Sequence, residues 1–447
     1  MKKILTLFIG ILFSIAINAQ ESTSLSLKQA IDFALQNSYA SINADRDVAI
    51  AKKKKWETTT IGLPQIDAKI DYTQWLKEQL ILIPAAFIGG APGEFTEVSF
   101  VTKHNMNATA TLNQLIFDGS YLVGLQSAKT YLKISENAKV KTELGIREAV
   151  INAYGNVLVS EESILIIEKN LKTLEKNLEE TTQIFLNGFI EEENVEQLKI
   201  TLSSVKSQLS KTKNLNLIAY KMLNITLGLD INTSIILTDS LTNLTQENIN
   251  LELLSSDLTI ENHIDYKIAK NTEKANELFV KLEQSKALPT LKSFVNFGYA
   301  GFGQSFDFMK KEQKWFDSSL LGVSLDIPIF SSLARSSRTQ QAKIELEKAK
   351  TNLTETEQKL SLLLASAKTN YNFSIEEYET SEQNLSLAER IEKKQQIKFF
   401  EGISTSFDLL EAQRQLYTMQ QSYLQAMLNV IANKATLDNA LNTPINN

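Results

Sequence analysis

The side chains that could support chemistry in this sequence are mainly carboxylates and amides. Asp408 and Glu411 stand three residues apart in the segment FEGISTSFDLLEAQRQL, which covers residues 400–416. On a helix, this spacing places both carboxylates on one face, where they would attract cations and repel anions. An ordinary solvated helix face has the same composition, and these residues alone favour that plainer interpretation.

The sequence has few of the residue types that catalytic and metal-binding sites usually need. The sequence has no Cys and two His, His104 and His263, which lie far apart along the chain. Without Cys there are no disulfides, thiolate metal sites, Cys nucleophiles or lipid-modified Cys residues. Two distant His do not favour a Ser-His-Asp site or a multi-His metal site. We therefore predict a protein that is not an enzyme, with no cofactor and no metal. The formal net charge of −6 also predicts no nucleic-acid partner.

The N-terminal segment has the composition of an export signal. It reads MKKILTLFIGILFSIAINAQ, with Lys2 and Lys3 first, the apolar run Ile4–Ile17 next and the small residue Ala19 last. This order is typical of a secretory signal peptide, which we place at residues 1–19. The alternative is a membrane anchor, but the run is short for a spanning helix. No later segment has about 20 uninterrupted apolar residues, so a mature chain embedded in a membrane would need β-strands.

Three motifs occur twice in the same order, which indicates a duplicated unit. LPQIDAKIDYT in the first half corresponds to LPTLKSFVNFGYAG in the second, and TLNQLIFDGS corresponds to SLDIPIFSSL. FLNGFIEEENVEQLKITL likewise corresponds to FFEGISTSFDLLEAQRQL. Each unit is too long for a solenoid repeat. We predict a first repeat at residues 20–228, a linker at 229–262, a second repeat at 263–441 and a short tail at 442–447.

Each repeat is expected to begin with a leading helix and two strands. The leading helices are predicted at residues 26–55 and 265–287. Apolar and polar residues alternate with a period of two in four segments, as at Ile66, Ala68 and Ile70. Strands of about 10 residues are long enough to cross a bilayer at a tilt, although a sheet in a soluble domain has the same pattern. The strands are predicted at residues 63–73, 105–117, 288–300 and 318–330.

Long helices follow the strands in both repeats. Apolar residues recur at alternating spacings of three and four from Val150 to Phe185, which is typical of a coiled-coil seam. A second seam is predicted from Val195 to Leu223 and a third from Phe407 to Ala435. A single helix over residues 121–185 would be about 98 Å long, which no compact domain requires. The tract 333–398 is expected to be helical but less regular.

Gly188 and Gly402 interrupt the long helices at corresponding places in the two repeats. Each break turns one long helix into the next, so each repeat is predicted to form a hairpin with a tip. The strands lie at the opposite end of the same helices. The expected product is a pair of helical hairpins joined to a small sheet.

The sequence resembles the TolC-type outer-membrane efflux proteins, also called outer membrane factors. The residues that carry the resemblance are LPQID, LNQLIFDG, LDIPIF and FEGISTSFDLLEAQRQL, and it covers essentially the whole mature chain. The departures are extra acids at the first tip, a short C-terminal tail, and a loop at residues 74–105 that is rich in Ala, Gly and Pro. That loop suggests an external segment of unusual shape.

This resemblance implies a mainly α fold with a small β part. The duplicated coiled-coil hairpins would form an α-barrel, and four strands per chain would contribute to a twelve-strand transmembrane β-barrel shared by a homotrimer. It implies an exit duct in the outer membrane for tripartite efflux or type I secretion. The partners would be a periplasmic adaptor, an inner-membrane pump and outer-membrane lipid. The alternative function is a periplasmic coiled-coil structural or adaptor protein.

The resemblance also implies roles for residues at the second tip. Asp408 and Glu411 match acidic positions that ring the narrow periplasmic entrance in this family, and three copies would bring six carboxylates together. Arg414 stands on the predicted third seam, where a lone charge is costly. We expect it to pair with Glu196 or Glu411 unless its charged end reaches solvent.

At the first tip, the corresponding positions are the uncharged Asn194 and Gln197, whose amides would bond neighbouring helices and help to keep the entrance shut. The run Glu191, Glu192 and Glu193 is either solvated or an adaptor contact. Gly188 and Gly402 are the expected tip turns.

Overall fold

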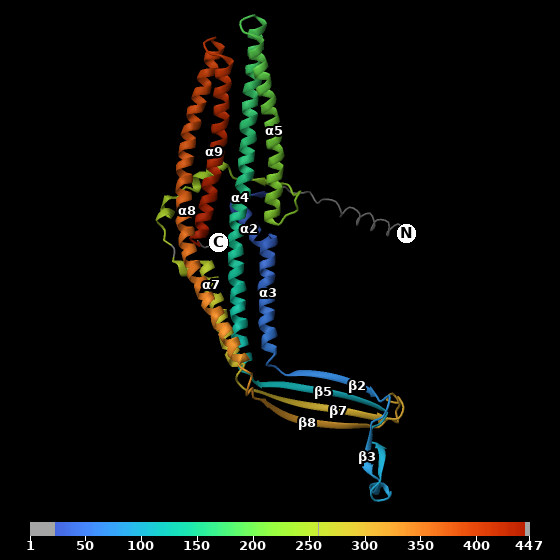
Figure 1. The fold of residues 1–447 in the computed structure, drawn as a ribbon. Helices are drawn as coiled ribbons and strands as arrows, with labels where there is room; N and C mark the ends of the chain where they lie inside the picture. Colours follow the sequence, from blue (N-terminus) through green and yellow to red (C-terminus); the bar gives the residue numbers. More distant parts are fainter. Residues whose placement is uncertain (1–22, 258, 443–447) are drawn as a thin grey trace, which may run out of the picture. The chain divides into compact units, whose positions relative to one another are not determined.

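A computed structural model describes residues 23–257 and 259–442 (Figure 1). The predicted signal peptide and residues 443–447 of the predicted tail lie outside the described residues. Contacts divide the chain into two compact units. The helical unit contains the described part of residues 1–48, 135–270 and 352–447, and the sheet unit contains residues 49–134 and 271–351. Each unit contains residues from both predicted repeats. The boundaries between the two compact units therefore differ from the boundaries between the repeats.

Helices account for most of the described chain. The leading segment, expected as one helix, is two, because Ser38 between them has an extended backbone (φ −63°, ψ 147°). Its hydroxyl accepts the N–H of Ser41 at 3.2 Å and caps the second helix. The helices are α2 (Leu27–Asn37), α3 (Tyr39–Thr60), α4 (Gly119–Leu186), α5 (Glu192–Leu227), α6 (Leu241–Glu247), α7 (Ile264–Ser285), α8 (Ala334–Phe400) and α9 (Ser406–Ala440). Three short 3₁₀ turns lie at Ala85–Ile88, Leu251–Ser255 and Ile260–Asn262.

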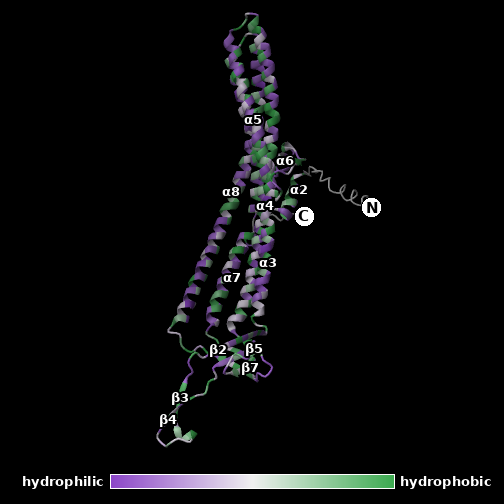
Figure 2. Ribbon diagram, turned by 90° about the vertical axis from the view of Figure 1, so that its right-hand side faces the viewer, coloured by the Kyte–Doolittle hydropathy of each residue, from purple (hydrophilic) through white to green (hydrophobic). Residues whose placement is uncertain are grey.

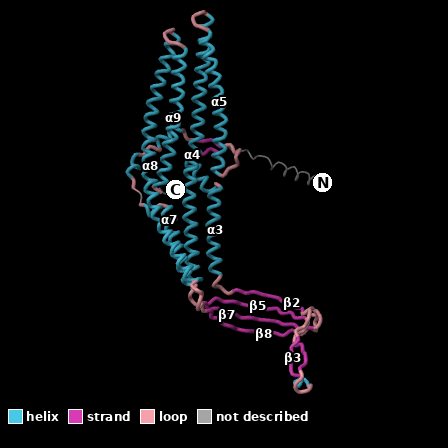
Figure 3. Tube along the Cα trace, viewed as in Figure 1, coloured by secondary structure: helices cyan, strands magenta, loops and turns pink. Residues whose placement is uncertain are grey.

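The four strands expected from the alternating pattern form one antiparallel sheet, drawn in magenta in Figure 3. Their order is β2, β5, β7, β8, with bounds β2 (Gln65–Gln74), β5 (His104–Phe117), β7 (Thr290–Gly303) and β8 (Trp315–Asp326). Four short strands were not predicted. β3 (Leu80–Pro84) and β4 (Phe95–Ser99) form a hairpin inside the loop at 74–105. β1 (Thr23–Leu25) pairs in parallel with β6 (Ile235–Leu237), which lies in the predicted linker.

The sheet has one apolar face and one largely polar face. The row of Ile66, Leu112, Val295 and Leu321 crosses all four strands on the apolar face. Ile66 and Leu321 at its ends are 73% and 72% exposed. On the opposite face, for example, the Asn296 amide donates to the Thr111 hydroxyl at 2.9 Å. Exposed apolar area costs about 25 cal/mol per Å² in water, so this face requires an apolar environment.

Both edges of this sheet are open. β2 and β8 each have a partner strand on one side only among the described strands. Every β2 residue except the half-buried Asp71 is exposed. An unpaired row of N–H and C=O groups is a template for another strand in water and is excluded in lipid.

The helical unit has a continuous apolar core. Val150, Tyr154 and Val157 of α4 have no exposed surface, and Val150 and Val157 belong to the first predicted seam. The same core includes Leu223 of α5 and Val430 of α9. Figure 2 shows hydrophobic residues interspersed with hydrophilic ones along these helices. Among the described helices, α4 alone is long and apolar enough to cross a membrane, and 44% of its most apolar stretch is buried inside the protein. The coiled-coil seam accounts for this apolar character.

Replacing Tyr154 by phenylalanine is expected to lower the free energy of unfolding by about 1–2 kcal/mol. The Tyr154 hydroxyl lies 3.0 Å from the Leu25 carbonyl and 2.9 Å from the Asp239 carboxylate, so its loss leaves buried acceptors with fewer donors. Burial also raises the pKa of Tyr154, which keeps the hydroxyl protonated. Thermal unfolding in detergent, followed by circular dichroism, measures the change. The control is Tyr39→Phe, at an exposed position, where we expect a change within about 0.5 kcal/mol. Equal stability of the two variants would contradict the prediction.

Candidate functional site

The two helical tips share one turn geometry. Gly188 and Gly402 have positive φ angles of 78° and 73°, a conformation in which glycine has no steric cost. After each glycine, the next N–H bonds a carbonyl five residues earlier, from Phe189 to Ile184 at 3.2 Å and from Ile403 to Lys398 at 2.8 Å. This is the hydrogen bond of a Schellman C-cap. The correspondence predicted from the sequence therefore extends to backbone geometry.

Asp408 is held at the first turn of α9 by a capping box. Its carboxylate accepts the N–H of Thr405 at 3.0 Å and the Thr405 hydroxyl at 2.7 Å. The Asp408 N–H lies 3.2 Å from the same hydroxyl oxygen. These hydrogen bonds to the ionised form lower the pKa of Asp408. Asp408 is therefore an exposed, fixed negative charge, and among the described residues it has no ion-pair partner within 4.0 Å.

Glu411 is engaged with Arg414 on the same helix. The Arg414 guanidinium donates to the Glu411 carboxylate at 2.5 Å, and both side chains are exposed. The structure thus selects Glu411 over Glu196 as the partner of Arg414. Of the two acids expected at the entrance, Asp408 carries an unpaired charge and Glu411 is locally compensated.

The third predicted seam is wrong near the tip. Arg414 and Phe407, which the heptad pattern placed on the packing face, are exposed. The first three turns of α9 are buried instead through Leu409, Gln413 and Leu416. These residues also recur at spacings of four and three, so the sequence contained two competing stripes. Contact with the neighbouring helices decides between them.

At the first tip, only one of the two amides links neighbouring helices. The Ser406 hydroxyl of α9 donates to the Gln197 side-chain oxygen at 2.9 Å, and the Gln197 amide donates to Glu193 at 3.0 Å. Gln197 thus joins the two tips within one chain. Asn194 instead donates to the carbonyl of Glu191 at 3.1 Å, inside its own turn.

The acidic run has a local role at the start of α5. Glu191 is the N-cap residue, and Glu192 and Glu193 lie in the first helical turn. Negative side chains are favourable there, because the helix dipole places partial positive charge at its N-terminus. This role accounts for the run without a partner protein.

Sequence reasoning missed a buried polar layer near the tips. Six of the seven buried side-chain atoms without a hydrogen bond in the described part belong to Asn177, Thr181, Gln395, Ser404 and Gln413. Gln413 is 1% exposed, and both of its amide atoms are unpaired. Each such atom costs about 1–3 kcal/mol. Thr181 lies on the first predicted seam. A polar residue at a seam position was the one sign in the sequence that could have indicated this buried polar layer.

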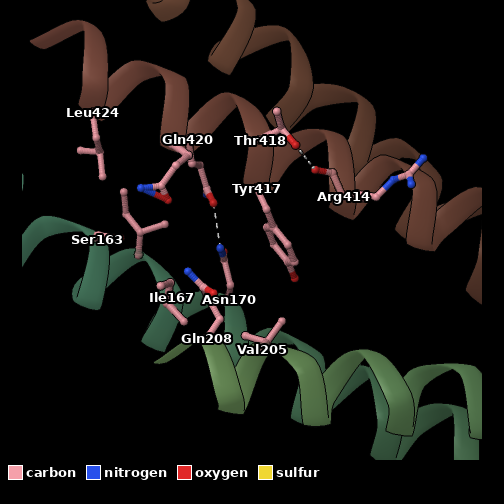
Figure 4. Close-up of a pocket in the computed structure, with 12 residues that line it drawn as sticks. Ser163, Ile167, Asn170, Val205, Gln208, Arg414, Tyr417, Thr418, Gln420 and Leu424 are labelled. Carbon is pink, nitrogen blue, oxygen red and sulfur yellow. Dashed lines mark hydrogen bonds between the residues drawn. The ribbon is translucent and has the colours of Figure 1, made fainter. Parts of the chain in front are cut away.

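A cavity lies beside this layer, between the first hairpin and α9 (Figure 4). Its volume is about 390 Å³. One hydrogen bond crosses it, from the Asn170 amide of α4 to the Gln420 oxygen of α9 at 2.7 Å. Figure 4 shows Tyr417 reaching from α9 toward Val205 of α5. The remaining lining includes Ser163, Ile166, Ile167, Gln208, Arg414, Thr418, Gln421 and Leu424. The two hairpins are thus loosely packed here.

Each of the two histidines takes part in a hydrogen bond within the fold. The Tyr72 hydroxyl lies 2.8 Å from Nδ1 of His104. Nδ1 of His263 accepts the N–H of Asp265 at 3.1 Å, and burial lowers the pKa of His263, which favours the neutral ring that this bond needs. Within the described ranges, no group of three or more His, Cys, Asp or Glu side chains is arranged to hold a metal ion.

Residues 257–443 match the sequence model of a family described as outer membrane efflux protein. No curated protein matches the sequence. The fold is similar to that of the outer membrane protein VceC from Vibrio cholerae, with 17% identity, a TM-score of 0.70, and coverage of 93% of this chain and 95% of VceC. CusC gives 16% identity, a TM-score of 0.73 and coverage of 96% and 95%. The CmeC outer membrane channel of Campylobacter jejuni is 16% identical, with a TM-score of 0.73 and coverage of 93% of this chain and 85% of CmeC.

Proposed function

We propose that this chain belongs to the outer membrane efflux protein family, whose sequence model matches residues 257–443, and that it is the outer-membrane exit duct of a tripartite efflux or type I secretion system. The observation that carries the proposal is the four-stranded sheet, with an exposed apolar face and two open edges, joined to long helical hairpins. The sheet supplies the membrane part and the hairpins the periplasmic part. The family consists of channels, and we propose that this chain catalyses no reaction.

We propose that three copies close one barrel. Four strands cannot close alone, because the smallest membrane barrels have about eight. β2 of one copy would pair with β8 of the next, which completes twelve strands and removes every open edge. The apolar row from Ile66 to Leu321 then faces lipid, and the polar row that includes Thr111 and Asn296 faces the lumen.

A duct in the outer membrane must be exported, and it needs partners on its periplasmic side. Residues 1–19 would direct export and be removed. The tips around Gly188 and Gly402 would meet a periplasmic adaptor that connects the duct to an inner-membrane pump. In this scheme, residues 20–228 and 263–441 form two equivalent repeats joined by the segment 229–262, and Glu191, Glu192 and Glu193 are available to the adaptor.

We propose that the duct opens by separation of the helical tips. The bond from Ser406 to Gln197 and the bond from Gln396 to Asn177, at 2.8 Å, hold the two hairpins together. The unpaired amide of Gln413 gains water when the hairpins part. Breaking the two hydrogen bonds raises the free energy of the open state, and hydrating the unpaired groups lowers it by a similar amount. An adaptor that contacts the open state slightly better than the closed state is therefore enough to shift the equilibrium toward opening.

Single-channel recording of the mature chain in planar bilayers tests the proposed function. We expect a stable trimer that inserts into lipid and gives discrete, cation-preferring conductance steps. Flotation with liposomes measures insertion separately, because a duct that is closed at its tips inserts into lipid but gives no conductance. A folded protein that stays out of lipid would support the alternative, a periplasmic structural or adaptor protein. The exposed apolar sheet face argues against that alternative, because a soluble sheet covers such a face.

A further inference from the structure

The segment between β2 and β5 is an apolar β-hairpin, here called the outer hairpin and defined as residues 76–103. It contains β3, a 3₁₀ turn and β4. It connects the end of β2 to the start of β5, and Figure 1 shows it projecting from that end of the sheet. Leu76 and Phe87 are 93% and 82% exposed. The other exposed large apolar residues are Leu80, Ile81, Leu82, Ile88, Phe95 and Phe100.

The outer hairpin has a definite shape. Five residue pairs connect β3 and β4 in regular antiparallel register. At its turn, a Cβ on Gly90 would lie 2.6 Å from the Cβ of Ala85, which is itself buried. At its base, the N–H of Trp75 donates to the carbonyl of Lys103 at 2.9 Å. The hairpin is therefore an ordered ribbon fixed to the end of the sheet.

Both faces of this ribbon carry apolar side chains. Leu80 and Leu82 point to one face, opposite Ser99 and Glu97, and Ile81 and Ile83 point to the other, opposite Val98 and Thr96. A two-stranded ribbon is at best marginally stable in water by itself. Burial of both faces would supply the missing stability, and it requires neighbours on two sides.

The position of the outer hairpin identifies those neighbours. It leaves the sheet directly after β2, the edge strand that meets the next copy in the proposed trimer. Twelve strands spaced about 4.8 Å apart and tilted by about 40° enclose a circle of radius about 12 Å. Strands of five residues make a ribbon about 17 Å long. Three such ribbons can therefore reach the threefold axis, where each contacts two others.

The charges of the segment argue against lipid as the cover. The outer hairpin has Lys77, Glu78 and Lys103 at its base, and in the stretch between Gln79 and Thr102 the only charged residues are Glu94 and Glu97. A segment that lies on a phosphate-bearing lipid surface gains from Lys and Arg, and this stretch has neither. Apolar contact with identical ribbons has no such requirement.

We propose that the outer hairpins of three copies pack on one another across the outer mouth of the barrel and form an apolar cap. The cap restricts the entry of large solutes from the outside. The proposal rests on the trimer of the proposed function. It assigns the chain a second barrier, separate from the helical tips.

A single cysteine in this Cys-free chain tests the contact between copies. Phe87→Cys places one thiol near the end of each exposed ribbon, and its side chain is too exposed for the change to affect folding. One disulfide can form per trimer, so up to about two thirds of the chains are expected as covalent dimers after mild oxidation of proteoliposomes. The matched control is Lys311→Cys, in the exposed loop between β7 and β8, where we expect at most a minor dimer fraction.

The outcomes separate the cap from the proposed function. Replacement of residues 77–102 by a short Gly-Ser turn should keep the trimer and raise entry of a large added antibiotic by about tenfold. Normal conductance with no dimers from Phe87→Cys would overturn the cap and leave the duct intact. Quenching of a fluorophore on that thiol by brominated lipid would assign the hairpin to lipid, and rapid labelling by a water-soluble maleimide without dimers would assign it to an outside partner. Either result overturns the cap. Absence of any trimer would count against the proposed function itself.

Discussion

Replacing Asp408 by asparagine is expected to lower the cation preference of the open duct by about fivefold. Asp408 is an exposed carboxylate without an ion-pair partner among the described residues, and the proposed trimer brings three copies together at the entrance. Asparagine removes the charge but keeps a side-chain oxygen that can accept the Thr405 N–H, so the helix start is preserved. The reversal potential in a salt gradient measures the permeability ratio of cation to anion.

The controls for this prediction separate charge from structure. Glu192→Gln removes an exposed carboxylate from the other tip and is expected to leave the ratio within about twofold of the unchanged protein. Glu411→Gln should act less than Asp408→Asn, or in a different way, because it also releases the Arg414 charge from its pair. An unchanged ratio in Asp408→Asn would reduce Asp408 to a helix-capping residue.

The same carboxylate determines the pH dependence of selectivity. Its pKa is lowered, first by the Thr405 hydroxyl and then by the Thr405 N–H. A group with a depressed pKa keeps its charge as the pH falls through the ordinary range for aspartate and loses it only below its own pKa. Cation preference should therefore persist through that range. Thr405→Val removes the hydroxyl, so the loss of selectivity should move to higher pH in the same reversal-potential titration.

Gly228→Ala is expected to cause the largest loss of stability of any conservative change discussed here, about 3 kcal/mol or more. Gly228 ends α5 with φ +82°, which alone costs an L-residue about 1–2 kcal/mol. A Cβ there would also lie 2.2 Å from the Asn37 carbonyl oxygen and 2.9 Å from the Ser38 Cα. Both are backbone atoms, so no side-chain rotation relieves the clash, and α2 must move away from α5.

Gly145→Ala is the matched control for this change. Gly145 lies inside α4 with no atom within 4 Å of an added Cβ. Alanine is the better helix former there, and we expect a gain of up to about 1 kcal/mol. Thermal unfolding of the detergent-purified trimers compares the two variants. A Gly228→Ala protein as stable as Gly145→Ala would mean that the ends of α2 and α5 do not pack as the structure has them.

Elements with a local signal could be predicted from the sequence. The four long strands and the four long helices follow from residue spacings that are visible within a few turns or a few alternating residues. The tip turns at Gly188 and Gly402 follow from a residue type that tolerates positive φ. The family resemblance was visible for the same reason, because its motifs lie where one long element is followed by the next.

The candidate site was predicted only in part. Asp408 and Gln197 were identified by position, yet the capping box of Asp408 and the bond from Ser406 to Gln197 were not. That bond joins residues 209 positions apart, and no local pattern records such a pair. The buried amide of Gln413 was missed because a heptad stripe through Arg414 fitted equally well.

What the sequence determined by itself is therefore the kind of each long element and where it turns. The tertiary structure decided which stripe of α9 is buried, which acid pairs with Arg414, that the leading helix breaks at Ser38, and that the loop after β2 is an ordered hairpin. The physical reason is the range of the interactions. Backbone conformation and periodicity depend on neighbours within a few residues, whereas the choice of a packing face depends on side chains that only folding brings together.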